Sequence, residues 1–155
     1  MLSGFLKSLQ QIIKDETSQT EFSRELNTAL SFIDSGFLPA SADGKTIFIC
    51  KGPEEEINSF KETDQVRFEF ECIKRPEFPS VKMNLELKDK SNKTSRFDYF
   101  FNIESDEEME LLARLEQQAY FDIVFVDSKI EYSKRVEITK SDRDKIKNAL
   151  VEARS

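Results

Sequence analysis

The sequence predicts an α+β fold in which a mainly antiparallel, twisted sheet of five to six strands is flanked by helices. Two observations predict it. Three stretches beyond residue 65 alternate between apolar and polar residues, as strands with one buried face do. Four other stretches, two before and two after these strands, carry apolar residues at helical spacing. The expected element order is therefore α-α-β-ββ-β-α-β-β-α.

Two helices are expected at the start of the chain. The second begins at a capping box formed by Ser18 and Glu21. It ends at Gly36, with Phe37 as the apolar contact that follows and Pro39 as the stop. The first is amphipathic, and its apolar stripe consists of Leu2, Phe5, Leu6, Leu9, Ile12 and Ile13.

Six strands follow, and the first is preceded by a turn at Asp43 and Gly44. The stretch at 53–60 is expected to form one short helix or an ordered loop. Residues 121–126 are almost continuously apolar, which predicts a central strand covered on both faces. The expected strands are Thr46–Cys50, Val66–Cys72, Val81–Lys88, Arg96–Ile103, Phe121–Val126 and Ile130–Ile138.

Two further helices are predicted in the second half of the chain. Ser105 and Glu108 form a capping box for a helix that reaches Ala119, and the acidic residues around its start suit the positive end of the helix dipole. Ser141 is expected to cap the last helix, whose buried side includes Ile146 and Leu150.

The composition excludes several kinds of chemistry. The chain of 155 residues is expected to form a single domain, 1–155, and it contains no histidine. This excludes Ser-His-Asp triads, Cys-His dyads and histidine-ligated zinc sites. The four glycines lie too far apart to build a glycine-rich nucleotide-binding loop. We therefore expect no cofactor and no metal, and we predict that the protein is not an enzyme.

The net charge and the two cysteines limit which partners and which cellular compartment are expected. The 23 basic and 30 acidic residues give a net charge of −7, which disfavours a generic nucleic-acid binder. No long apolar run and no secretion signal are visible in the sequence, so neither membrane insertion nor export is expected. Cys50 and Cys72 are interpreted as buried, reduced thiols, which is typical of a cytoplasmic protein.

One short pattern carries possible metal chemistry. Pro76-Glu77, followed after eight residues by Glu86-Leu87-Lys88, resembles the signature of the PD-(D/E)xK nucleases. The resemblance implies that Glu77 and Glu86 would be Mg²⁺ ligands and that Lys88 would be the catalytic lysine. The alternative is that Glu86 and Lys88 belong to the solvated face of their strand.

That polar strand face is a second candidate site. It would form a groove if no helix covers it, and otherwise a solvated face with cross-strand charge pairs. Its expected members are Arg67, Glu69, Glu71, Lys82, Asn84, Glu86, Lys88, Arg96, Asp98 and Asn102.

From residue 21 onward, the element order without the Thr46–Cys50 strand is helix, three strands, helix, two strands, helix. This order is similar to that of the type III secretion chaperones. The resemblance implies a small acidic dimer that binds extended segments of partner proteins.

We therefore predict a non-enzymatic, cytoplasmic protein-interaction module of chaperone-like or adaptor type. Its protein interface, and the contact of a homodimer, is expected at Leu2, Phe5, Leu6, Leu9 and Ile13, within a separable helix at 1–16. Two alternatives stay open: the Mg²⁺-dependent nuclease, and an acidic inhibitor or immunity-type protein that neutralises a basic partner.

Overall fold

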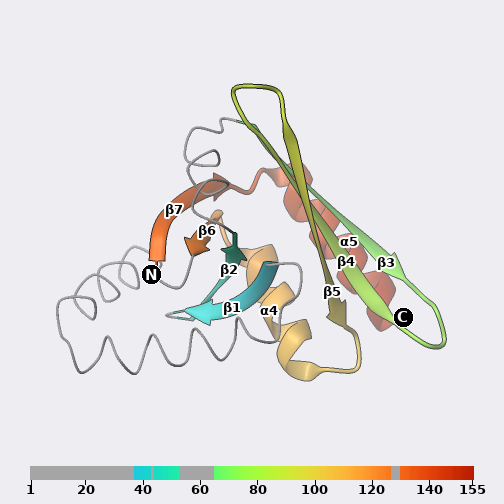
Figure 1. Ribbon diagram of the computed structural model, residues 1–155. Helices are drawn as coiled ribbons and strands as arrows, with labels where there is room; N and C mark the ends of the chain where they lie inside the picture. Colours follow the sequence, from blue (N-terminus) through green and yellow to red (C-terminus); the bar gives the residue numbers. More distant parts are fainter. Residues whose placement is uncertain (1–36, 43, 53–64, 127–129) are drawn as a thin grey trace.

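The computed structural model describes residues 37–42, 44–52, 65–126 and 130–155. These residues form seven strands and two helices, so the fold is mixed α+β as predicted (Figure 1). The helices expected at 2–13 and 18–33 and the segment at 53–60 lie outside the described residues.

The strands form two sheets rather than the single sheet predicted from the sequence. The first sheet has the order β1-β2-β6-β7, and its strands β2 and β6 run parallel while the other neighbours are antiparallel. Parallel neighbours need a long connection between them. The connection between β2 and β6 contains the second sheet and helix α4 (Asp106–Gln117). The strands of the first sheet are β1 (Phe37–Ala42), β2 (Lys45–Lys51), β6 (Tyr120–Val126) and β7 (Ile130–Glu137).

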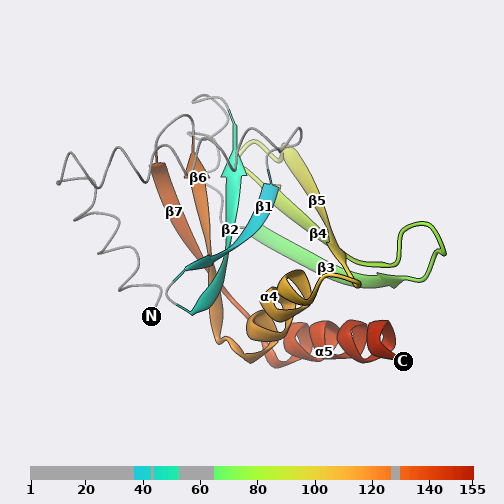
Figure 2. The same ribbon diagram turned by 90° about the horizontal axis from the view of Figure 1, so that it is seen from below.

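The second sheet is an antiparallel meander of β3 (Gln65–Ile73), β4 (Ser80–Lys88) and β5 (Thr94–Asn102). Helix α4 (Asp106–Gln117) follows β5, and helix α5 (Lys140–Arg154) ends the chain. Figure 2 shows the strands of the two sheets running at a steep angle to each other, with both helices on the same side of the molecule.

Strand β1 was not predicted, because Gly36, Phe37 and Pro39 fit the end of a helix. Phe37–Ala42 instead pairs with β2 at the edge of the first sheet. Proline is tolerated there because an edge strand needs its N–H groups on one side alone. The expected turn is present before β2, where Gly44 adopts a φ of 74°.

The predicted central strand is confirmed. Strand β6 lies between β2 and β7, and all its residues from Phe121 to Val126 are buried. Phe121 links the sheets, since its ring packs edge-on against Phe48 of β2 and Phe68 of β3, with centroid distances of 5.3 and 5.2 Å. Of the two thiols, Cys50 is buried, whereas Cys72 is partly exposed, contrary to the prediction.

Of the two N-terminal cap residues predicted for α4 and α5, the structure confirms the one of α4. Ser105 caps α4, and its hydroxyl accepts a hydrogen bond from the backbone N–H of Glu108 at 3.3 Å. The cap of α5 is Thr139 and not Ser141. Thr139 forms a full capping box with Asp142, so the helix begins earlier than predicted.

The second sheet has a buried inner face and an open outer face. Val81, Met83, Leu85 and Leu87 of β4 point inward and are buried in the core. Helix α5 buries its apolar side in the same core, so it covers the inner face. The polar residues predicted for the wet face do share the outer face, and no described element covers it.

Candidate functional site

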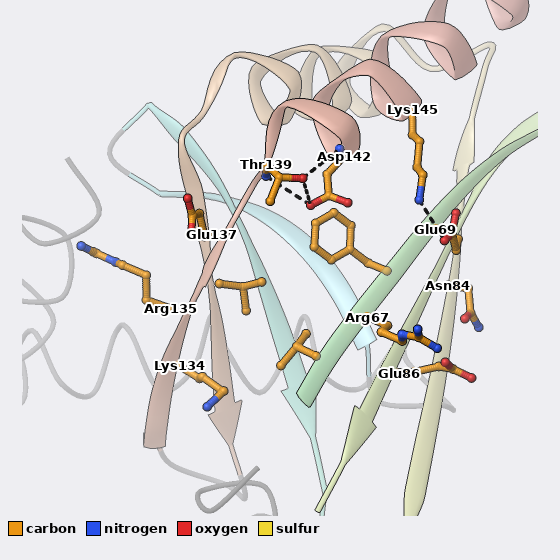
Figure 3. Close-up of a pocket in the computed structure, with 13 residues that line it drawn as sticks. Arg67, Glu69, Asn84, Glu86, Lys134, Arg135, Glu137, Thr139, Asp142 and Lys145 are labelled. Atoms are coloured by element: carbon orange, nitrogen blue, oxygen red, sulfur yellow. Dashed lines mark hydrogen bonds and ion pairs between the residues drawn. The ribbon is translucent and has the colours of Figure 1, made fainter. Parts of the chain in front are cut away.

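A groove of about 910 Å³ lies where the two sheets come apart (Figure 3). One wall is the first half of β3, and the other is the end of β7. The first turn of α5, with Thr139 and Asp142, closes one end. We call this space the β3–β7 groove.

Both walls are edge strands. Strand β3 is one of the two edge strands of the second sheet, and β7 is one of the two edge strands of the first. In a sheet, every second residue of an edge strand directs its N–H and C=O groups away from its neighbour, where they can pair with another chain. Within the described residues, no other strand pairs with the groove side of β3 or β7.

The floor of the groove is apolar. Val66 and Phe68 of β3 and Val136 of β7 point into the space between the sheets, and the last two are 7% and 8% exposed. Lys134 lies on the same side of β7 as Val136, because it pairs with the core residue Ile123 in register. A charged residue at a core-facing position of an edge strand is thus part of the groove.

Most charged groups on the rim are bonded to neighbours. The Lys145 Nζ atom lies 3.0 Å from the Glu69 carboxylate. Asp142 accepts a hydrogen bond of 2.7 Å from the Thr139 hydroxyl. These bonds join α5 to β3 and fix the start of the helix, so they shape the groove.

Two more ion pairs hold rim residues in place. Arg96 lies 2.7 Å from Glu86 on the outer face of the second sheet. Arg135 donates to the buried Asp122 at 3.1 and 3.4 Å, and this hydrogen bonding raises the pKa of the guanidinium above its usual value. The side chains of Arg67 and Glu137 differ, because neither side chain makes a hydrogen bond or ion pair with another described residue.

The residues of the nuclease-like pattern are not brought together. Glu77 is exposed in the turn between β3 and β4, whereas Glu86 and Lys88 lie at the far end of β4. Glu86 is about 20 Å along the strand from Ser80, where β4 begins. No group of three or more acidic or cysteine side chains that could hold a metal ion occurs among the described residues.

The predicted protein interface at Leu2, Phe5, Leu6, Leu9 and Ile13 lies outside the described residues. The predicted polar face, in contrast, lies within the described residues, and four of its members line the β3–β7 groove. They are Arg67, Glu69, Asn84 and Glu86. The β7 side of the groove was not predicted from the sequence. Its signal was Lys134, a charge at the core-facing parity of an otherwise apolar alternation.

A second cleft, of about 630 Å³, lies at the opposite end of the outer face. Phe78 and Phe100 are 73% and 51% exposed there, and the Lys82 Nζ atom lies 5.8 Å from the centre of the Phe100 ring. The exposed aromatic rings make this cleft apolar, whereas the β3–β7 groove combines an apolar floor with a charged rim.

Within the described part of the chain, no helix is long and apolar enough to cross a membrane. No protein-family model, curated protein or solved structure matches the chain. The similarity to the type III secretion chaperones therefore rests on element order and net acidity alone.

Proposed function

We propose that the protein is a non-enzymatic protein-interaction module and that its partner binds in the β3–β7 groove. The observation that carries this proposal is the meeting of two sheet edges over an apolar floor. Sheet edges bind other chains readily, because their backbone groups are already aligned for hydrogen bonding.

The lining of the groove supports a protein partner over a small molecule. Small-molecule sites are mostly apolar cavities of about 300–1,000 Å³. The groove is at the upper end of this range, but its apolar residues are confined to the floor and charged residues surround them. An apolar centre with a polar rim is the usual composition of a protein–protein interface.

The bonding of the rim supports binding over catalysis. Glu69, Glu86 and Asp142 are each held by a neighbouring side chain in an ion pair or a capping box. Acid–base or metal chemistry would instead need carboxylates that converge on one reacting atom or ion. The cytoplasmic location, the single-domain organisation and the homodimer through the first helix belong to the same proposal.

The test is a selection from a displayed library of random protein fragments against the full-length protein. Binders are then measured against two groove variants: Val66→Arg, which fills the floor, and Glu137→Arg, which changes an exposed rim charge. Lys147→Glu is the control, because this exposed α5 residue lies outside the groove.

We expect Val66→Arg to weaken the selected fragments by at least about tenfold, which corresponds to 1.4 kcal/mol. The Lys147→Glu control should leave their affinity unchanged. Melting temperatures establish that each variant is folded. If Val66→Arg is not folded, a change in affinity in either direction on Glu137→Arg is the result that locates the fragments in the groove. Fragments that bind all variants equally, or a library that yields no binder, would overturn the proposal.

A further inference from the structure

We infer that the β3–β7 groove takes an extended, acidic segment of the partner protein, which adds to the first half of β3 as a new strand. This inference rests on the proposed function and specifies the mode of binding and the chemistry of the segment. It follows from three features: the open part of the β3 edge, the protected edge of β7, and the pairing of the charges around them.

The first half of β3 is the open part of its edge. From Glu69 onward, α5 lies beside the strand, as shown by the Lys145–Glu69 ion pair and by the hydrogen bond of 3.1 Å from Lys74 to Ser155 at the end of both elements. Val66, Arg67 and Phe68 line the groove instead. Their ladder with β4 is regular, so alternate residues direct backbone N–H and C=O groups toward the groove.

Strand β7 has two features that typically protect an edge strand from pairing. Its register with β6 is irregular between Phe125 and Val126, at the end of β7 remote from the groove, and Lys134, within the groove, points toward the space between the sheets. Bulges and inward-pointing charges both disfavour the addition of another strand. Figure 3 also shows β7 and β3 diverging toward α5, so one segment can follow one of these strands but not both.

The charges favour an acidic segment. The carboxylates of Glu69, Glu86 and Asp142 are already bonded within the protein. Arg67 has no such partner among the described residues, and it sits on the open stretch of β3. Glu137 is the remaining rim carboxylate, but it lies on the side of β7 that faces away from Val136 and the floor.

The two faces of an added strand would meet different surroundings. One set of alternating side chains would contact the apolar floor and Lys134, and the other would lie beside Arg67. The segment is therefore expected to alternate between aliphatic and acidic residues, with backbone hydrogen bonds providing affinity and the carboxylates providing selectivity.

The test uses synthetic peptides and the full-length protein. The probe is a peptide of alternating valine and glutamate, compared with the same peptide carrying lysine for glutamate. Two further peptides keep the side chains of the first but are N-methylated at alternate amides, one peptide for each of the two possible registers. The protein variants are Arg67→Glu and, as a matched control, Arg75→Glu, which lies in the β3–β4 turn outside the groove.

We expect the glutamate peptide to bind at least about tenfold more tightly than the lysine peptide. One register of N-methylation should abolish binding, since it removes the donors that face β3, whereas the other should be tolerated. Arg67→Glu should reverse the charge preference, and Arg75→Glu should retain it.

The outcomes separate this inference from the proposed function. If selected protein fragments bind in the groove but are neither acidic nor sensitive to N-methylation, the inference is overturned and the proposed function stands. If the glutamate peptide binds Arg67→Glu as well as the wild type, the charge argument is wrong. If no fragment and no peptide binds in the groove, both proposals fail.

Discussion

Asp122 is buried to 1% exposure and depends on Arg135 for its charge partner. Arg135 is 44% exposed on its side chain and also stacks on Tyr120, with 3.8 Å between the guanidinium carbon and the ring centre. Removing one partner of a buried ion pair leaves the other charge without compensation, which costs far more than the pair contributes while intact.

We therefore predict that Arg135→Gln lowers the free energy of unfolding by about 3 kcal/mol, the lower end of the range for such a loss, because Arg135 itself is partly hydrated. Adding Asp122→Asn should restore part of the loss. Arg96→Gln, which breaks an ion pair whose arginine is 70% exposed, should cost less than about 1 kcal/mol. Urea denaturation of the four proteins checks this, and equal losses for Arg135→Gln and Arg96→Gln would contradict it.

The ionisation of a second single residue, Tyr99, is expected to make the free energy of unfolding depend on pH. Burial, and then the hydrogen bond that its hydroxyl donates to Glu108, raise the pKa of Tyr99 above the usual value for tyrosine. The neutral phenol is thus favoured in the folded protein, so its stabilising contribution is complete below about pH 10, the pKa in the unfolded chain, and is lost as the pH rises further.

The unfolding free energy of the wild type should therefore decrease more steeply above about pH 10 than that of Tyr99→Phe, which has no phenol to ionise. Denaturant unfolding between neutral pH and pH 11 measures the two slopes. Parallel curves for the two proteins would show that Tyr99 does not contribute.

At the scale of elements, the cap of α5 provides a direct comparison. The Thr139 hydroxyl accepts from the N–H of Asp142, and the Asp142 carboxylate accepts from the N–H of Thr139, both at 3.2 Å. We predict that Thr139→Ala lowers the free energy of unfolding by about 1 kcal/mol, whereas Ser141→Ala changes it by less than about 0.5 kcal/mol. Thermal unfolding distinguishes them, and a larger effect for Ser141→Ala would contradict the assignment.

Local patterns predicted most elements but not all of their ends. The alternation in β3, β4 and β5 and the apolar run in β6 located these strands, because one-sided and two-sided burial leave different patterns in the sequence. Strand β1 was missed because Pro39 ends a helix and tolerates an edge strand equally well. Thr139 and Ser141 both suit a cap, and the structure uses Thr139, whose hydroxyl accepts from the N–H of Asp142.

At the scale of the whole molecule, the sequence did not separate the two sheets. Which strands are neighbours depends on contacts between distant segments, such as the parallel pairing of Phe48 with Ile123. For this reason, one wall of the candidate site could be predicted from the sequence and the other could not. Arg67 and Glu86 follow from the alternation of their strands, whereas the opposing wall at Lys134 depends on where β7 lies.

A buried amide connects elements across the molecule. Gln118, at the end of α4, accepts from the Thr46 N–H at 2.7 Å and donates to the carbonyls of Thr46 and Tyr120, each at 3.1 Å. Gln118→Leu would leave these buried backbone groups without partners, and each costs about 1–3 kcal/mol. We predict a loss of at least about 2 kcal/mol in urea unfolding, and a loss below 1 kcal/mol would show that water replaces the amide.

We propose above that the β3–β7 groove binds an extended protein segment along β3. Amide hydrogen exchange, measured on the full-length protein with and without the valine–glutamate peptide, detects such binding at the strand itself. We predict that the peptide slows exchange in residues 66–69 of β3 and leaves the turn around Phe78 unchanged, because new backbone hydrogen bonds protect the strand edge. A bound peptide that protects the Phe78 region, or that leaves residues 66–69 unprotected, would contradict it.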